Sequence, residues 1–165
     1  MTFHIGIDLG GTKIFGAALA VDGSTIFNHR LPTPRHDYSA TISTINEIVS
    51  KIETELGSSA PVGICIPGSI SPLTGLIQNA NSTWLNDKKF QEDLEQALER
   101  PLRLANDANC FALSESVDGA GSDASSVFGV ILGTGVGGGV VIDKKIVNGP
   151  RSIGGEWGHC SLPFP

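Results

Sequence analysis

Two glycine-rich turns, each set between strand-like runs, constrain this chain more than any other feature. The first is Ile7–Lys13 (IDLGGTK), within His4–Val21, and the second is Gly133–Gly139 (GTGVGGG), within Val127–Ile142. Glycine permits a tight turn and lets backbone N–H groups approach an anion. Two such turns suggest two clamps on one polyphosphate, although a hairpin without any ligand explains either turn taken alone.

Two familiar nucleotide motifs are excluded by the residues on the C-terminal side of the glycines. Gly133-x-Gly135-x-x-Gly138 matches the dinucleotide fingerprint, which requires a helix after it, whereas the β-rich run Val140–Ile142 comes next here. The first turn resembles a P-loop, but Thr12 occupies the lysine position and no helical pattern comes after it. The second turn nevertheless holds more glycines than a hairpin needs, since glycine inside a strand weakens a sheet.

Composition narrows the possible partners. The 165 residues carry a net charge of −6 without a basic cluster, which argues against nucleic acid as the main partner. No apolar run reaches membrane-spanning length, and the N-terminal stretch lacks the pattern of a signal peptide. Cys65, Cys110 and Cys160 are odd in number and widely spaced, as expected of reduced thiols in a cytoplasmic protein.

The hydrophobic periodicity predicts a strand meander followed by helix–strand units, and therefore an α/β fold with a mixed sheet and flanking helices. The expected elements are strands at 3–8, 13–21 and 24–31, a helix at 37–56 ended by Gly57, a strand at 62–66, a helix capped by Asp87 and ended by Pro101, a strand at 102–105, a helix at 107–117, and a hairpin at 127–142. Ligands in such sheets gather at the carboxyl ends of strands. Asp8, Gly68 and Asp107 all fall at such ends, which predicts one shared site.

Asp107 is the candidate general base, because phosphoryl transfer to a hydroxyl needs a carboxylate within hydrogen-bond reach. The alternative is that Asp107 only caps the helix that it begins. The neighbouring Asn106 and Asn109 favour a polar ligand such as a sugar. At the first turn, Asp8 can hold magnesium through water, or can bond its own backbone as turn aspartates do. Lys13 offers a positive charge there, or is a solvated strand residue.

Five segments together resemble the N-terminal part of bacterial sugar kinases of the ROK (repressor, open reading frame, kinase) family. They are Gly6–Lys13, Gly63–Gly68, Leu104–Cys110, Gly133–Gly139 and Gly155–His159, and they occur in the family's order over nearly the whole chain. Each is weak alone, and their order makes the resemblance specific.

The resemblance implies a ribonuclease-H-like (actin-like ATPase) lobe at residues 1–120 and the start of a second lobe at 121–165. It implies an ATP-dependent hexose kinase with Asp107 as base and magnesium held through water near Asp8. The implied sugar contacts are Gly68, Asn81, Asn106, Glu156 and His159, and the implied ATP contacts are Asp8, Gly10, Gly11, Thr12, Lys13, Gly133, Thr134, Gly135, Val136, Gly137 and Gly138. His159 matches a zinc ligand, but this chain alone cannot assemble a complete zinc site.

Within the family, Gly68–Pro72 and Asn79–Asn86 look most like bacterial fructokinase/mannokinase, which implies conversion of fructose to fructose 6-phosphate. The alternatives are an N-acetylglucosamine or glucose kinase, or a non-catalytic sugar-binding or assembly lobe. Family members run to about twice this length, so the chain resembles an isolated N-terminal part. An apolar face left exposed by a missing lobe would favour a homo-oligomer.

Overall fold

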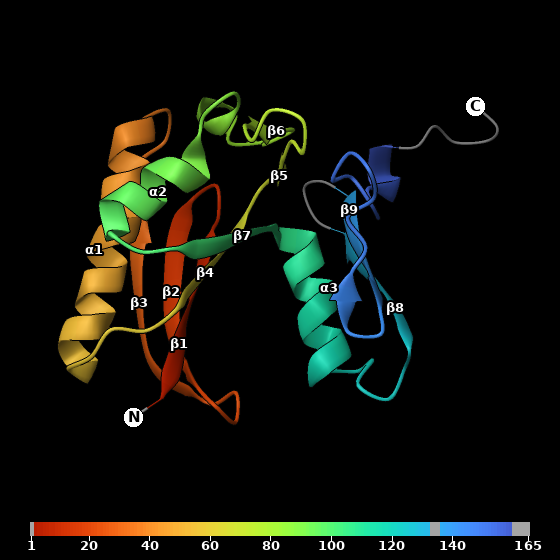
Figure 1. The fold of residues 1–165 in the computed structure, drawn as a ribbon, viewed down its shortest axis with the longest axis horizontal. Helices are drawn as coiled ribbons and strands as arrows, with labels where there is room; N and C mark the ends of the chain where they lie inside the picture. The colour runs from red at the N-terminus through yellow and green to blue at the C-terminus, as the bar shows by residue number, and fades with distance from the viewer. Residues whose placement is uncertain (1, 133–135, 160–165) are drawn as a thin grey trace. The chain divides into compact units, whose positions relative to one another are not determined.

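The computed structural model describes residues 2–132 and 136–159, apart from the side chain of His159. Within them, the order of the main elements is the predicted one (Figure 1). The elements are β1 (Phe3–Leu9), β2 (Lys13–Ala20), β3 (Thr25–Pro32), α1 (Tyr38–Leu56), β4 (Val62–Ile66), β5 (Ser69–Ile70), β6 (Ile77–Gln78), η1 (Thr83–Leu85), α2 (Phe90–Leu98), β7 (Leu102–Asn106), α3 (Asp107–Val117), β8 (Ser126–Leu132), β9 (Val136–Ile142), β10 (Lys145–Ile146) and η2 (Trp157–His159).

The chain divides into two compact units. The first comprises Met1–Ile70 and Thr74–Ala105, and the second comprises Ser71–Leu73 and Asn106–Pro165. The predicted lobe boundary at residue 120 stays a prediction. No helix in the described part of the chain combines the length and apolar character that crossing a bilayer requires.

The first unit is built on a five-stranded sheet in the order β3-β2-β1-β4-β7. The strands β1, β2 and β3 form an antiparallel meander, while β4 runs parallel to β1, which confirms the predicted mixed sheet. Along β1 the residues alternate: Phe3, Ile5, Ile7 and Leu9 are buried, whereas His4 and Asp8 are exposed. This period of two directs one face of the strand into the core beneath α1 and α2.

Helix α1 forms as its sequence signals at both ends predict. The side chain of Asp37 accepts a hydrogen bond from Ala40 N at 2.9 Å, and Gly57 stops the helix with φ of 67°. Its apolar face lies directly on β2, where a Cβ at Gly16 would come within 2.3 Å of Ile48 Cγ2. Glycine at this position therefore sets how closely the helix approaches the sheet.

Helix α2 differs from the prediction at both ends. Asp87 does not cap it; instead Asp87 has φ of 61° and donates its N–H to Ile77 O at 2.9 Å, next to β6. The helix begins at Phe90 without a side-chain cap, and Glu99 ends it in a left-handed conformation before Pro101 is reached. A tertiary hydrogen bond thus overrides a local capping signal.

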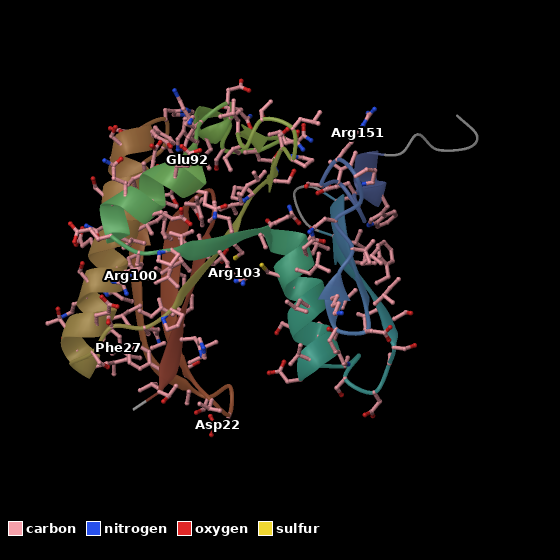
Figure 2. The ribbon with its side chains drawn as sticks, in the orientation of Figure 1. Asp22, Phe27, Glu92, Arg100, Arg103 and Arg151 are labelled. Carbon is pink, nitrogen blue, oxygen red and sulfur yellow. The ribbon has the colours of Figure 1, made fainter. Side chains whose placement is uncertain are left out.

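Polar side chains such as Glu92 on α2 and Asp22 in the β2–β3 turn are exposed (Figure 2).

The second unit packs α3 against an antiparallel sheet in the order β10-β9-β8. Glycines make the contact close: a Cβ at Gly129 would lie 2.8 Å from Ala112 Cβ, and one at Gly139 would lie 2.6 Å from Ala108 O. At the far end of α3, the ammonium group of Lys144 donates to the carbonyl oxygens of Ser116 and of nearby loop residues. This ammonium lies where the helix dipole is negative.

Candidate active site

The first glycine turn joins β1 to β2 as the predicted hairpin, in which Leu9 pairs with Ile14. Gly10 N donates to Lys13 O at 3.0 Å, and a Cβ at Gly10 would lie 2.9 Å from the same oxygen. Gly11 has open space at its Cβ position, and it is exposed together with Thr12 and Lys13. The turn is therefore tight at Gly10 and accessible at the three residues after it.

Asp8 lies at the carboxyl end of β1, beside the turn. Its neighbour across the parallel pairing with β4 is Cys65, whose thiol lies 3.4 Å from Asp8 Oδ1 and donates a hydrogen bond to it. Asp8 is exposed while Cys65 is partly buried. The carboxylate is therefore oriented by one neighbour and remains open to a solvated cation, as magnesium coordination through water requires.

Gly68 and the segment that carries Asn81 belong to one loop region of the first unit. Gly68 has φ of 112°, and a Cβ there would lie 2.7 Å from Gln78 O and 2.9 Å from the Ala80 Cα. The Asn86 side chain accepts from Ala80 N at 2.9 Å and donates to Ala80 O at 3.2 Å. This pair of hydrogen bonds fixes the backbone immediately before the exposed Asn81.

At the start of α3 the capping role belongs to Asn106 and not to Asp107. Asn106 is 8% exposed, and its Oδ1 accepts from Asn109 N at 3.1 Å. Asp107 is exposed and its Oδ1 accepts from Ala108 N at 2.8 Å, within the first turn of the helix. A negative side chain is favoured at this helix end. The alternative explanation of Asp107 as a simple helix cap is therefore weakened.

Asn109 is the next polar residue along the same turn of α3. It is 4% exposed, its Nδ2 donates to Asn148 Oδ1 at 3.5 Å, and its Oδ1 accepts no hydrogen bond from the residues that the structure describes. Buried amide oxygens are nearly always satisfied by protein, water or ligand. A hydroxyl donor from a bound molecule or a water would satisfy this one.

The segment Gly155–His159 packs directly on β9. Gly155 has φ of 89° with its Cβ position 2.7 Å from Gly138 O, and the Trp157 indole N–H donates to Gly137 O at 3.0 Å. Glu156 lies between these two residues in the sequence, and it is half-buried. The structure thus places Glu156 beside the strand that leaves the second glycine turn.

The strands that flank the second glycine turn, β8 and β9, pair antiparallel as predicted. Gly133, Thr134 and Gly135 lie outside the described residues, so their expected contact with phosphate stays a prediction, as does that of Val136 and Gly137. Gly138 and Gly139 have a packing reason of their own, because a Cβ would meet Gly155 O at 2.9 Å and Ala108 O at 2.6 Å respectively. The surplus of glycine is thus explained in part without a ligand.

The zinc ligand set is not found in the described part of the chain. There, no three His, Cys, Asp or Glu side chains are grouped as a metal site requires. The His159 side chain and Cys160 lie outside the described residues. The residues described do not fit a structural zinc, which needs four ligands, and no step of the chemistry is assigned to it.

Sequence reasoning missed several residues that shape the site. Thr33 and Arg35, on the C-terminal side of β3, both donate hydrogen bonds to the first glycine turn. Cys65 donates to Asp8 across 57 positions of the sequence, and Asn86 binds the backbone of Ala80 within the same loop region. Thr33 and Arg35 lie in no motif, and only the pattern of buried polar side chains could have indicated Thr33. Cys65 and Asn86 lie within the segments that carry the family resemblance, but their hydrogen bonds could not be predicted from those segments.

Comparison with known proteins identifies the family. The ROK family model matches residues 4–165. An N-acetyl-D-glucosamine kinase of Salmonella gallinarum (strain 287/91 / NCTC 13346) is 44% identical over 97% of this chain and 53% of its own length. The expected closer resemblance to fructokinase/mannokinase is not supported. The curated relatives found at this level of similarity, such as that of S. gallinarum, are N-acetyl-D-glucosamine kinases.

Solved structures give the same assignment. A ROK hexokinase from Thermus thermophilus has a TM-score of 0.82 at 32% identity over 98% of this chain and 54% of its own. A ROK glucokinase from Streptomyces griseus, solved with glucose and AMPPNP, has a TM-score of 0.82 at 27% identity over 97% of this chain and 51% of its own. The first unit accordingly has the expected ribonuclease-H-like (actin-like ATPase) architecture of mixed sheet and flanking helices. The chain spans about half the length of the curated relatives that it matches, and it belongs to the ROK family.

Proposed function

We propose that the protein is an ATP-dependent sugar kinase that phosphorylates N-acetyl-D-glucosamine. The observation that carries this proposal is the 44% identity to an N-acetyl-D-glucosamine kinase over 97% of the chain. This proposal replaces fructose, the substrate expected from the sequence motifs, with N-acetyl-D-glucosamine, which was one of the alternatives to it.

ATP is assigned to the two glycine turns. The amides of Gly11, Thr12 and Lys13 are available on an exposed turn, and Gly133 to Gly138 would meet the phosphates from the other hairpin. Support comes from the S. griseus relative, which was solved with the ATP analogue AMPPNP. When bound, magnesium would neutralise charge on the phosphates, and Asp8 is the carboxylate suited to hold it through water.

Asp107 is assigned as the general base. A sugar hydroxyl would donate its proton to the Asp107 carboxylate while its oxygen forms a bond to the γ-phosphorus and the bond to ADP breaks. The Asn106 cap supports this role, because the Asn106 side chain accepts from Asn109 N and so the helix does not depend on Asp107 for its cap. Helix geometry then fixes the direction of the carboxylate.

The sugar is assigned to the five residues that the family resemblance implies. Gly68, Asn81, Asn106, Glu156 and His159 are the proposed contacts, and the buried Asn109 oxygen that accepts no described hydrogen bond suits a hydroxyl donor. The acetamido group distinguishes N-acetyl-D-glucosamine from glucose, and such a group is recognised by hydrogen bonds that its analogue leaves unpaired. We further propose a cytoplasmic homo-oligomer without nucleic-acid or membrane partners.

The test is a substrate panel with the full-length protein that contains this chain. Production of ADP from ATP is measured with N-acetyl-D-glucosamine, N-acetylmannosamine, glucose, mannose and fructose. We expect the highest kcat/KM for N-acetyl-D-glucosamine. A preference for glucose would reassign the protein within the family, and no ADP with any sugar would support a non-catalytic lobe. Sedimentation velocity of the same sample tests the oligomer, which a purely monomeric profile would refute.

A further inference from the structure

Three successive carbonyl groups of the first glycine turn are bound by the segment after β3. Thr33 Oγ1 donates to Gly10 O at 2.6 Å, Arg35 Nε donates to Gly11 O at 3.1 Å, and Thr33 N donates to Thr12 O at 3.1 Å. Thr33 is only 7% exposed, although it is polar. Two residues therefore bind the carbonyl side of the whole turn.

This arrangement decides where the N–H groups point. In a trans peptide the N–H points opposite to the C=O of the preceding residue, and the described chain contains no cis peptide bond. The N–H groups of Gly11, Thr12 and Lys13 therefore point away from the groups that bind the carbonyls. All three residues are exposed. Successive N–H groups directed to one side form a concave site for an anion.

We propose that Thr33 and Arg35 are positioning residues that hold this turn in its anion-binding orientation. The inference rests on the proposed function, in which the turn binds ATP phosphates. A glycine turn can rotate its peptides at low cost, and a rotated peptide would present a carbonyl oxygen to the phosphate. Hydrogen bonds to the carbonyl oxygens oppose that rotation, and the Arg35 guanidinium adds positive charge beside the turn.

The experiment compares Thr33→Val with Thr33→Ser in the full-length protein. Valine keeps the shape of threonine without the hydroxyl, whereas serine keeps the hydroxyl. We expect Thr33→Val to raise the KM for MgATP about tenfold and to leave the KM for the sugar unchanged, with Thr33→Ser close to wild type. Arg35→Gln, at an exposed position that does not endanger folding, is expected to raise the KM for MgATP by about fivefold.

A matched control separates positioning from general stability. Thr44→Val removes a similar hydroxyl-to-carbonyl bond, from Thr44 Oγ1 to Ala40 O at 2.8 Å, within α1. Its KM for MgATP should equal that of wild type. The inference is overturned if Thr33→Val and Arg35→Gln both keep the wild-type KM for MgATP, or if Thr44→Val raises it equally. A wild-type protein that neither turns over nor binds MgATP in calorimetry refutes the proposed function instead.

Discussion

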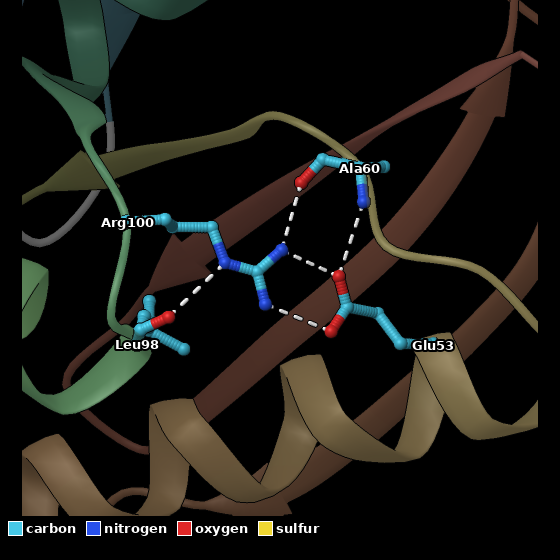
Figure 3. A network of polar contacts seen from close by, with 4 residues as sticks. All are labelled: Glu53, Ala60, Leu98 and Arg100. Carbon is cyan, nitrogen blue, oxygen red and sulfur yellow. Dashed lines mark hydrogen bonds and ion pairs between the residues drawn. The ribbon is translucent and has the colours of Figure 1, made fainter.

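The carboxylate of Glu53 on α1 and the guanidinium of Arg100 after α2 form a bidentate ion pair. Arg100 Nη1 lies 2.5 Å from Glu53 Oε1, and Nη2 lies 2.8 Å from Oε2 (Figure 3). The same groups bind both backbone atoms of Ala60, which leads into β4: Arg100 donates to its carbonyl at 3.1 Å and Glu53 accepts its N–H at 3.1 Å. The pair thus connects α1 and the residue after the end of α2 to the segment that leads into β4, an interior strand of the sheet.

Glu53→Gln should destabilise the first unit in a pH-dependent way. Hydrogen bonds from Arg100 lower the pKa of Glu53, so the pair stabilises the fold above the pKa of an unfolded glutamate and this contribution is lost as the pH falls below about 4. Urea unfolding at pH 7 should show a loss of about 1–3 kcal/mol in the free energy of unfolding, and little difference from wild type at pH 3. Glu55→Gln, which removes an exposed pair with Lys51, is the control and should change neither value.

Gly139→Ala should destabilise the second unit, because the new Cβ would lie 2.6 Å from the backbone oxygen of Ala108. Helix α3 must then move away from β9, at a cost of about 1–3 kcal/mol. Gly137→Ala is the matched control on the same strand, since the nearest atom to its Cβ is Ala108 Cβ at 3.8 Å. Thermal unfolding followed by circular dichroism gives the melting temperatures of both variants. Equal melting temperatures for the two variants would show that α3 does not require glycine at 139.

Lys144→Met should loosen the end of α3. Its ammonium group donates to the carbonyl oxygen of Ser116 in the last turn of the helix and, at 2.6 Å, to that of Ser122 in the following loop, so the substitution leaves both carbonyls without their cation. We expect a loss of about 1–2 kcal/mol in urea unfolding. Lys145→Met, on the exposed adjacent residue of β10, should be close to wild type. Hydrogen exchange that is unchanged at 114–118 in Lys144→Met would contradict this account.

Asp107→Asn should abolish turnover and preserve sugar binding. The amide cannot accept the hydroxyl proton, and loss of a general base costs about 10²–10⁴ in kcat. The fold should persist because the helix cap is supplied by Asn106. Steady-state kinetics give kcat, and calorimetry gives the affinity for the sugar. Asp118→Asn, beyond the other end of α3, is the control; a near-normal kcat in Asp107→Asn would remove this residue from the mechanism.

Asp8→Asn should raise the magnesium concentration needed for half-maximal activity. The amide oxygen can still accept from the Cys65 thiol, so the local structure is kept while the negative charge that attracts the cation is lost. A magnesium titration at fixed ATP measures the effect. Asp22→Asn, in the β2–β3 turn, carries the same charge change at an exposed site and should match wild type. An unchanged magnesium requirement in Asp8→Asn would count against its proposed role.

Local signals in the sequence were sufficient for most of the secondary structure. Alternation along β1, the apolar stripe of α1 with Asp37 and Gly57 at its ends, and both glycine hairpins arise from interactions between residues close in sequence. Helix α2 was an exception at both ends: a hydrogen bond from Asp87 to Ile77 replaced the expected cap, and Glu99 ended the helix before Pro101. Motif order was also sufficient for the ROK family, but it did not separate fructose from N-acetyl-D-glucosamine, since related sugars differ by few groups and pocket contacts decide between them.

The sequence by itself therefore determined the order of the elements, the hairpins and the candidates for chemistry, because periodicity and turn residues act over a few positions. Only the tertiary structure decided which groups, distant in the sequence, form hydrogen bonds with these candidate residues. Strand register pairs Cys65 with Asp8, and the return of the chain after β3 brings Thr33 to the carbonyl of Gly10. Close packing of α3 explains why Gly139 can carry no side chain. These pairings depend on how strands and helices meet in space, which no local pattern encodes.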